Sequence, residues 1–440
     1  MKYLLPAVIF LSLSAYSVSQ TAADSNTGKD SKASNDSVRK GWNIGYLPAI
    51  AYDSDLGLYY GIIINPFYYG DGKIYPNYYQ KLFLQVAGYS KGSSEHIIEW
   101  ETYTFLPSVK FNARLKYQGY RAYPFYGYNG NEAIYNHSWE DEKDPAYKTR
   151  MYYRLARKHF RISADIQDTI GNSKFQWQAG WAMGSFKMGA VKPSSDYPDT
   201  AVLYERYIDW GLIGNGEKDG GITNSFMAGL IYDTRNRLTN PGKGIFTELD
   251  LKWTPSFLTT GGYSSLSIGL IHKQYFTLIN RRLIFAYRLW WNATLYGDSP
   301  FYARQILTTF AGSEGYGGTS TLRGGLMQRI VTRDFLMGTA ELRTRLINFR
   351  FIRQNMWYLG AVFFTDAGRI LKPFSLNTAN VPSDLKPLYF GDIDKSIHAT
   401  LGGGIKLVMN ENFVLSAEYA VPFDPQDGIS GLYLGLNYQF

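Results

Sequence analysis

The C-terminal segment alternates strictly between two kinds of side chain. Small or polar residues such as Gly435 and Asn437 occupy every second position, and the positions between them are apolar or aromatic: Leu432, Leu434, Leu436, Tyr438 and Phe440. Successive side chains of a β-strand point to opposite faces of the sheet. This period of two predicts a final strand over residues 430–440 with one apolar and one polar face.

The same alternation recurs upstream, and there it places the charged side chains on the strand face opposite to the leucines. Leu249 and Leu251 flank Asp250, and Leu289 follows Arg288. An Arg or Lys on the lipid face of a membrane-spanning strand costs roughly 2–4 kcal/mol near the midplane. We therefore expect the charges to face a lumen and the leucines to face lipid. Aromatic residues make up 17% of the chain, which suits the aromatic girdles of a transmembrane β-barrel.

Sixteen segments carry strand signals, and single-chain bacterial barrels have an even number of strands. They are residues 43–53, 57–68, 79–90, 95–105, 109–119, 148–166, 173–188, 222–233, 244–254, 262–277, 281–296, 332–346, 355–366, 397–409, 412–422 and 430–440. The sequence predicts an all-β protein, an antiparallel transmembrane barrel of about 16 strands. With the N-terminus in the periplasm, the long connections point outward. We expect the barrel to be closed, because lipid cannot satisfy a free strand edge.

The first 40 residues precede the predicted barrel and fall into two zones. A basic start, an apolar stretch from Leu4 to Leu13 and small residues up to Ser19 predict a cleaved signal peptide over residues 1–19. Residues 20–40 are mostly small and polar and have almost nothing to bury, so they are expected to be a disordered periplasmic tail. The barrel would then span residues 41–440 and lie in the bacterial outer membrane.

Composition excludes several classes of function. The chain has no Cys, which excludes disulfides and thiol catalysis. Its net charge of +8 is spread without a basic cluster on a recognisable helix motif, so nucleic acid is not an expected partner. The five His residues lack metal-ligand spacing, and no G-x-S-x-G elbow occurs. We expect no metal, no cofactor and no enzymatic activity; a Ser-His pair assembled across strands is the one catalytic alternative.

Three segments carry motifs that go beyond a generic barrel. Thr-Leu-Arg-Gly-Gly lies at 321–325, and Phe-Thr-Asp-Ala-Gly lies at 364–368. They resemble the Arg-Gly-aromatic loop motif and the Phe-x-Asp-x-Gly strand motif of the BamA-type outer-membrane assembly barrels, the bacterial surface antigen superfamily. The third segment, at 233–244, looks like the inner turn between the eighth and ninth strands and contains Asp233, Arg235, Asn236, Pro241 and Gly244. The resemblance covers roughly residues 41–440.

This resemblance implies that the long loop after the eleventh strand folds into the lumen. Its motif residues are Leu322, Arg323, Gly324 and Gly325. A guanidinium stays charged and its desolvation is costly, so Arg323 needs carboxylates close to it. Asp366 and Glu341 are the expected acceptors, and Gly324 and Gly325 would let the loop turn sharply or approach the wall. Whether this contact only stabilises the barrel or also serves its activity is left open by the sequence.

The chain also departs from the family pattern. Gly325 stands where an aromatic residue commonly follows Arg-Gly, and assembly members carry POTRA domains where this sequence has only residues 20–40. The resemblance therefore does not imply that POTRA domains deliver client proteins, the proteins to be inserted, to this barrel. The alternation that ends at an aromatic residue resembles the C-terminal signal read by the outer-membrane assembly machinery, and the signal residues here are Leu436, Tyr438 and Phe440.

Three functions are consistent with these observations. The first, which the resemblance favours, is insertion or translocation of outer-membrane or surface proteins without POTRA domains of its own, if the first and last strands can separate. The second is a passive or gated pore for small solutes, and the third is a structural outer-membrane protein. The expected partners are outer-membrane lipid, the assembly machinery that inserts the chain itself, and further periplasmic or outer-membrane proteins.

Overall fold

The computed structural model describes residues 38–53, 57–74, 78–90, 92–106, 109–191, 201–238, 240–279, 282–310, 315–351, 355–392, 397–409, 413–436 and 438–440. The predicted signal peptide, residues 1–19, and residues 20–37 of the predicted tail lie outside these ranges. Both therefore remain predictions.

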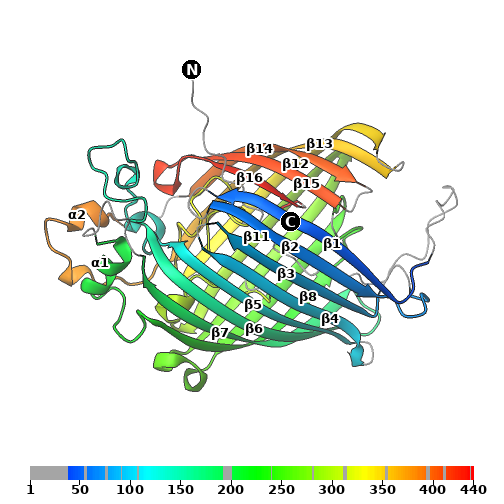
Figure 1. Cartoon of the computed structure of the whole chain (residues 1–440), viewed down its shortest axis with the longest axis horizontal. Coiled ribbons are helices and arrows are strands. Elements are labelled where there is room, and N and C mark those ends of the chain that lie inside the picture. Colours follow the sequence, from blue (N-terminus) through cyan, green and yellow to red (C-terminus); the bar gives the residue numbers. More distant parts are fainter. Residues whose placement is uncertain are drawn as a thin grey trace.

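In the described ranges, sixteen strands form one sheet in which each strand pairs antiparallel with the next in sequence (Figure 1). The strands are β1 (Trp42–Asp53), β2 (Gly57–Tyr68), β3 (Gln80–Tyr89), β4 (Ser94–Leu106), β5 (Val109–Pro124), β6 (Arg154–Thr169), β7 (Phe175–Ala190), β8 (Gly220–Asp233), β9 (Gly244–Thr254), β10 (Ser265–Ile279), β11 (Leu283–Gly297), β12 (Asp334–Phe351), β13 (Asn355–Lys372), β14 (His398–Met409), β15 (Phe413–Pro422) and β16 (Gly431–Leu436). The predicted all-β class, strand number and strand order are confirmed.

The wall of the barrel has an apolar outer face and a polar inner face. On β9, Leu249 and Leu251 are 36% and 42% exposed, whereas Asp250 between them is 2% exposed. On β11, Leu289 is 49% exposed and Arg288 is 2% exposed. The expected lumenal placement of these charges is confirmed.

Short helices occur only in the connections of the described chain. They are α1 (Leu203–Asp209), α2 (Lys386–Tyr389) and the 3₁₀ turns η1 (Gly130–Glu132), η2 (His137–Trp139), η3 (Ser256–Leu258), η4 (Thr260–Gly262), η5 (Phe301–Ala303), η6 (Thr378–Asn380) and η7 (Pro425–Asp427). None of the helices in the described residues has the length and apolarity to cross a membrane.

The long connections at one end of the strands, which the sequence predicts to be the outer ones, pack together through an aromatic cluster that we call the outer cap. Figure 1 shows α1 and α2 side by side beyond one end of the strands. Buried aromatic residues from four connections meet there, including Phe125, Tyr128, Tyr204, Tyr207, Phe301, Phe374 and Tyr389. Phe125 makes edge-on contacts with Tyr207 and Phe301, with ring centroids 5.2 and 5.7 Å apart. Such pairs are stabilising beyond their buried area, so the cap joins segments distant in sequence.

The sheet has two free edges, which corrects the expectation of a barrel closed by hydrogen bonds. In the described part of the chain, β1 pairs with β2 and β16 pairs with β15, but no backbone pairing joins β1 to β16. The lengths of the edge strands differ, since β1 has 12 residues and β16 has six. We call the junction between β1 and β16 the seam.

The last strand is shorter than the sequence predicts, because the chain end leaves the wall. β16 stops at Leu436, and Phe440 is buried against Tyr275 of β10 and Ala286 of β11. Arg343 of β12 donates a hydrogen bond to the Phe440 carbonyl oxygen at 2.8 Å. The prediction of a strand through residue 440 is therefore wrong. Arg343 and the pocket of Tyr275 and Ala286 instead hold Phe440 inside the barrel.

We predict that Leu249→Lys destabilises the folded barrel by roughly 2–4 kcal/mol, because the new charge lies on the lipid face at the centre of β9. Leu258→Lys, at an exposed position in η3 beyond the strand, is the matched control and should cost about 1 kcal/mol or less. Urea titration of folding in lipid vesicles measures both. Equal losses in the two variants would contradict the assignment of this face to lipid.

Candidate functional site: the Arg323 clamp

The loop between β11 and β12, residues 298–333, carries the candidate site, and we call it the lumenal loop. Its Arg323 is fully buried and contacts carboxylates on three strands. Arg323 Nε and Nη2 donate to the two carboxylate oxygens of Asp366 on β13 at 2.9 and 3.0 Å. Arg323 Nη1 donates to Glu341 on β12 at 2.8 Å and to Glu418 on β15 at 3.2 Å. The guanidinium therefore ties the loop to three separate parts of the wall.

The backbone around Arg323 adds contacts that the motif glycine permits. The Arg323 amide donates to Asp366 at 3.0 Å, and the Gly324 amide donates to the Tyr433 hydroxyl on β16 at 2.6 Å. Gly324 has a φ of +93°, and an added Cβ would lie 2.9 to 3.0 Å from atoms of Ala420 on β15. A side chain at this position would be strained and would push the loop from the wall. Gly325 makes no such demand, since its φ is not positive.

Two aromatic or apolar surfaces complete the pocket around the motif. The Arg323 guanidinium carbon lies 3.3 Å from the centroid of the Phe364 ring, so the ring stacks on the charged plane. Leu322 is buried in a separate apolar group with Trp290, Tyr316 and Phe335. These contacts exclude water from the guanidinium, which strengthens its attraction to the carboxylates.

Wall cations balance the charges of the clamp. Arg343 contacts Glu341 at 2.8 Å, and Lys406 contacts Glu418 at 2.5 Å. The cluster therefore holds three cations and three carboxylates: Arg323, Arg343, Lys406, Asp366, Glu341 and Glu418. Burial acts to lower the pKa of Arg323, but the Asp366, Glu418 and Glu341 carboxylates outweigh burial and raise it well above its usual value. Arg323 consequently stays charged at every pH the protein meets.

The inner-turn motif makes a second set of contacts, within the turn itself. Arg235 Nη2 contacts the Asp233 carboxylate at 2.7 Å, and the Asn236 side-chain oxygen accepts from the Gly242 and Lys243 amides at 3.0 and 3.1 Å. Gly244 has a φ of +109°, and a Cβ there would lie 2.3 Å from the Thr234 carbonyl oxygen. Pro241 is buried in the same turn. The motif fixes the shape of the turn before β9 begins.

The final residues lie near the clamp, although the sequence predicted them on the wall. Phe440 and Tyr438 both stack on Arg343, at 5.0 and 4.2 Å from its guanidinium carbon. Gln439 donates to the Thr319 carbonyl of the lumenal loop at 3.0 Å. The side chain of Leu436 lies outside the described residues. The role of Leu436, Tyr438 and Phe440 as an assembly signal stays a prediction.

Comparison with family models gives one match. The model described as "Omp85 superfamily domain" matches residues 100–440, which is most of the chain. The chain belongs to the Omp85 superfamily. Omp85 barrels are bacterial outer-membrane proteins, which places this chain in the outer membrane. Among curated protein sequences, none matched.

Two solved structures share the Omp85 fold with this chain. BamA from Haemophilus ducreyi lacking POTRA domains 1–3 has 15% identity and a TM-score of 0.56, with 90% of this chain and 69% of that chain covered. CdiB from Escherichia coli has 9% identity and a TM-score of 0.55, with 89% and 61% covered. At these identities the likeness shows a common barrel fold.

Several residues of the site were not assigned from the sequence. Glu418 and Lys406 belong to the clamp, and Tyr433 holds the loop at β16. Alternation placed Glu418 on the lumenal face, but it does not specify which lumenal charges meet across the barrel. Arg329 was also missed. It donates to the Gly130, Ala133 and Gln426 carbonyls at 2.6 to 2.9 Å, and burial lowers its pKa.

We predict that Arg323→Met lowers the free energy of unfolding by about 3–5 kcal/mol, because it leaves buried carboxylates without their cation. Adding Asp366→Asn to that variant should restore part of the loss, since it removes one uncompensated charge. Denaturant unfolding in micelles measures both. Arg333→Gln, at a partly exposed position of the same loop, is the control and should change stability by less than about 1 kcal/mol. If the double variant loses as much free energy of unfolding as Arg323→Met and Asp366→Asn lose together when made singly, the pairing of the two residues is contradicted.

Proposed function

We propose that this Omp85 barrel inserts or translocates outer-membrane or surface proteins, and that the seam is where it acts on them. The activity proposed is mechanical and not enzymatic, and it resides in the barrel. The observation that carries the proposal is that β1 and β16 present unpaired edges in the described chain. The superfamily and the fold shared with BamA and CdiB support it.

An open strand edge is a chemical template for another strand. The free edge of β1 presents the backbone groups of alternate residues along a strand of 12 residues, in which Pro48 lacks an amide N–H, and an extended segment of a client can pair with such a row. Trp42, Ile44 and Tyr46 of β1 are 52 to 78% exposed, so the edge is flanked by an apolar lipid-facing surface. A client strand paired there would have its backbone satisfied and its apolar side chains in lipid, which is the requirement for a spanning strand.

The Arg323 clamp connects the lumenal loop to the other side of the seam. Gly324 contacts Tyr433 on β16, and Arg323 contacts Glu418 on β15, so the loop holds the last two strands from inside. The short β16 pairs with β15 over six residues, which is little backbone pairing to keep it in place. The clamp therefore sets the position of the edge that a client must displace or join.

The structure disfavours the alternative of an open pore. The lumenal loop occupies the interior next to β12, β13 and β15, and the outer cap packs the outer connections together. A solute would have to pass both. A gated pore would require the clamp and the cap to open, whereas insertion at the seam leaves both in place.

The test measures how fast a denatured small outer-membrane barrel folds into liposomes that contain the purified protein. The wild type should accelerate folding over empty liposomes. Because the chain has no native Cys, a disulfide can form only between the two Cys residues introduced in each variant. Ile44→Cys with Leu434→Cys places one thiol on β1 and one on β16, and oxidation should abolish the acceleration. Reduction should restore it.

A control disulfide away from the seam distinguishes the effect of closing the seam from the effect of making the whole barrel more rigid. Phe226→Cys and Trp253→Cys lie opposite each other on β8 and β9, and a crosslink there should leave the acceleration unchanged. Arg323→Met should reduce the acceleration severalfold if it folds, which a heat-dependent shift in gel mobility checks. Acceleration that survives the oxidised seam lock, or none at all in the wild type, would overturn the proposal. Conduction of small ions that persists in the locked protein would instead identify a pore.

A further inference from the structure

Two lysines meet on the outer face of strands β6 and β7, which contribute no residue to the Arg323 clamp. Lys158 of β6 and Lys187 of β7 are direct partners in the antiparallel register. Both are exposed, whereas the adjacent residues His159 and Phe186 are 2% and 5% exposed. Because successive side chains of a strand point to opposite faces, the two lysines lie on the lipid-facing side of the wall.

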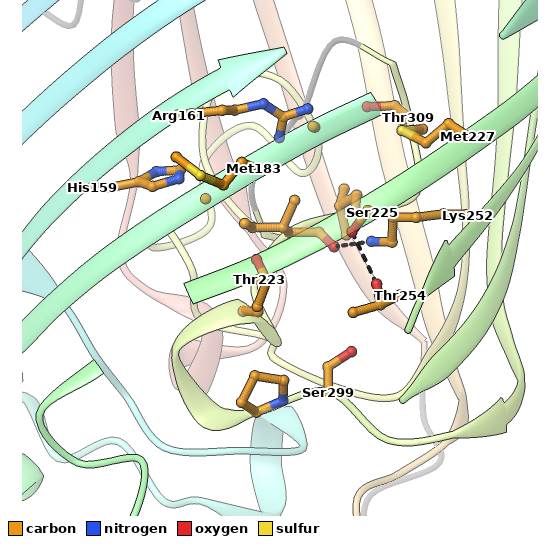
Figure 2. A pocket seen from close by; sticks show the side chains of 16 residues that line it. His159, Arg161, Met183, Thr223, Ser225, Met227, Lys252, Thr254, Ser299 and Thr309 are labelled. Atoms are coloured by element: carbon orange, nitrogen blue, oxygen red, sulfur yellow. Dashed lines mark hydrogen bonds between the residues drawn. The ribbon is translucent and has the colours of Figure 1, made fainter. Parts of the chain in front are cut away.

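The interior side of the same strands is identified by its own contacts. His159 and Arg161 of β6 line a pocket that they share with Lys252 of β9 and with the first arm of the lumenal loop, residues 299–309 (Figure 2). This pocket lies between the wall and the loop, so His159 and Arg161 point inward. Lys158, which stands next to His159, therefore points away from the lumen.

The lysine pair lies near the end of the strands that carries the outer cap. A spanning strand needs about 9–11 residues, and β6 and β7 have 16 each, so their ends extend beyond the hydrocarbon. Lys158 is the fifth residue of β6, which begins just after the cap residue Tyr153, and Lys187 is the fourth residue from the end of β7. This position places both ammonium groups at the level of the lipid headgroups of the predicted outer leaflet.

The protein does not balance these two charges. Like charges directly opposite each other on neighbouring strands are destabilising. The next positions in the same row of the sheet are Gly119 beside Lys158 and Gly220 beside Lys187. Among the described residues, no carboxylate lies within ion-pair distance of either lysine. Asp219, the residue before Gly220, instead interacts electrostatically with a tyrosine of the outer cap. The repulsion between the lysines is thus open to compensation by an external anion.

Hydroxyl groups and a third cation border the lysine pair. A Cβ at Gly119 would lie 3.2 Å from the Tyr117 hydroxyl and 3.4 Å from the Ser94 hydroxyl, so both groups adjoin the open position beside Lys158. Arg121, two residues further along β5, is exposed as well. Ammonium and hydroxyl donors together match the several acceptor oxygens of a phosphate group.

We propose that Lys158 and Lys187 bind the phosphate of a phosphorylated lipid in the outer leaflet. The phosphate would lie between the two ammonium groups and offset their repulsion. Toward the middle of the membrane the outward face continues with Phe160 and with Ile222, which is 44% exposed, and acyl chains can cover both. The continuity of the charged pair with this apolar surface favours a lipid over a soluble anion or an acidic protein.

The test is native mass spectrometry of the purified full chain, released from neutral-detergent micelles that contain added lipid. The two lipid probes are dioleoyl phosphatidic acid and dioleoyl phosphatidylcholine, which have the same acyl chains. Lys158→Gln removes one ammonium of the pair. Arg369→Gln is the matched control, because Arg369 is exposed near the same end of β13 and pairs with the outward Leu336, and its loss changes the net charge equally.

The wild type should bind phosphatidic acid more tightly than phosphatidylcholine. Lys158→Gln should weaken the binding of phosphatidic acid about tenfold, and Arg369→Gln should leave it unchanged. Equal affinity for the two lipids, or equal weakening in the two variants, overturns the proposal. Displacement of phosphatidic acid by an equal concentration of inorganic phosphate would identify a site for a free anion and also overturns it.

Folding of each variant is checked by its heat-dependent shift in gel mobility. If Lys158→Gln does not fold, Lys187→Gln takes its place and the same outcomes apply. The measurement contains no client protein, so its result is independent of the proposed insertion activity.

Discussion

The buried guanidinium of Arg323 is the interaction on which the interior of this barrel depends. Removing a guanidinium from water costs several kcal/mol, and close opposite charge offsets that cost. Asp366, Glu341 and Glu418 supply this charge from three strands, so the loop position and the strand positions are determined together. A change in any one of these strands is transmitted to the loop through a single ion.

The placement of the strands could be predicted from the sequence because lipid imposes a local rule. Every membrane strand must alternate, so Leu249, Asp250 and Leu251 reveal their faces without knowledge of their neighbours. β9 has the predicted bounds, Gly244–Thr254. β6 begins at Arg154 and not at residue 148, because the segment before it packs Tyr152 and Tyr153 into the outer cap. Tertiary burial there overrides the strand pattern.

Contacts between distant residues could not be predicted in the same way. The alternation through Phe440 is genuine, yet the residue turns inward, where Arg343, 97 positions earlier, donates a hydrogen bond to its carbonyl oxygen inside the lumen. The roles of Glu418 and Tyr433 likewise depend on which strands meet the loop across the barrel. The resemblance in short motifs identified Arg323 and its partner Asp366, which lie in two of those motifs, and the need of a guanidinium for carboxylates added Glu341 as an expected acceptor. The resemblance carried no information on Lys252 or Arg329.

The lumenal loop is held at three points that differ in physical character. Arg323 uses buried opposite charge, Arg329 uses neutral carbonyls of the outer connections, and the first arm places the Ile306 carbonyl on Lys252. The first of these contacts is self-sufficient, because the cluster around it is balanced. The third is a hydrogen bond from an ammonium to a neutral carbonyl oxygen. The loop is therefore held by buried opposite charges near the seam, and by contacts to neutral groups at the outer connections and at β9.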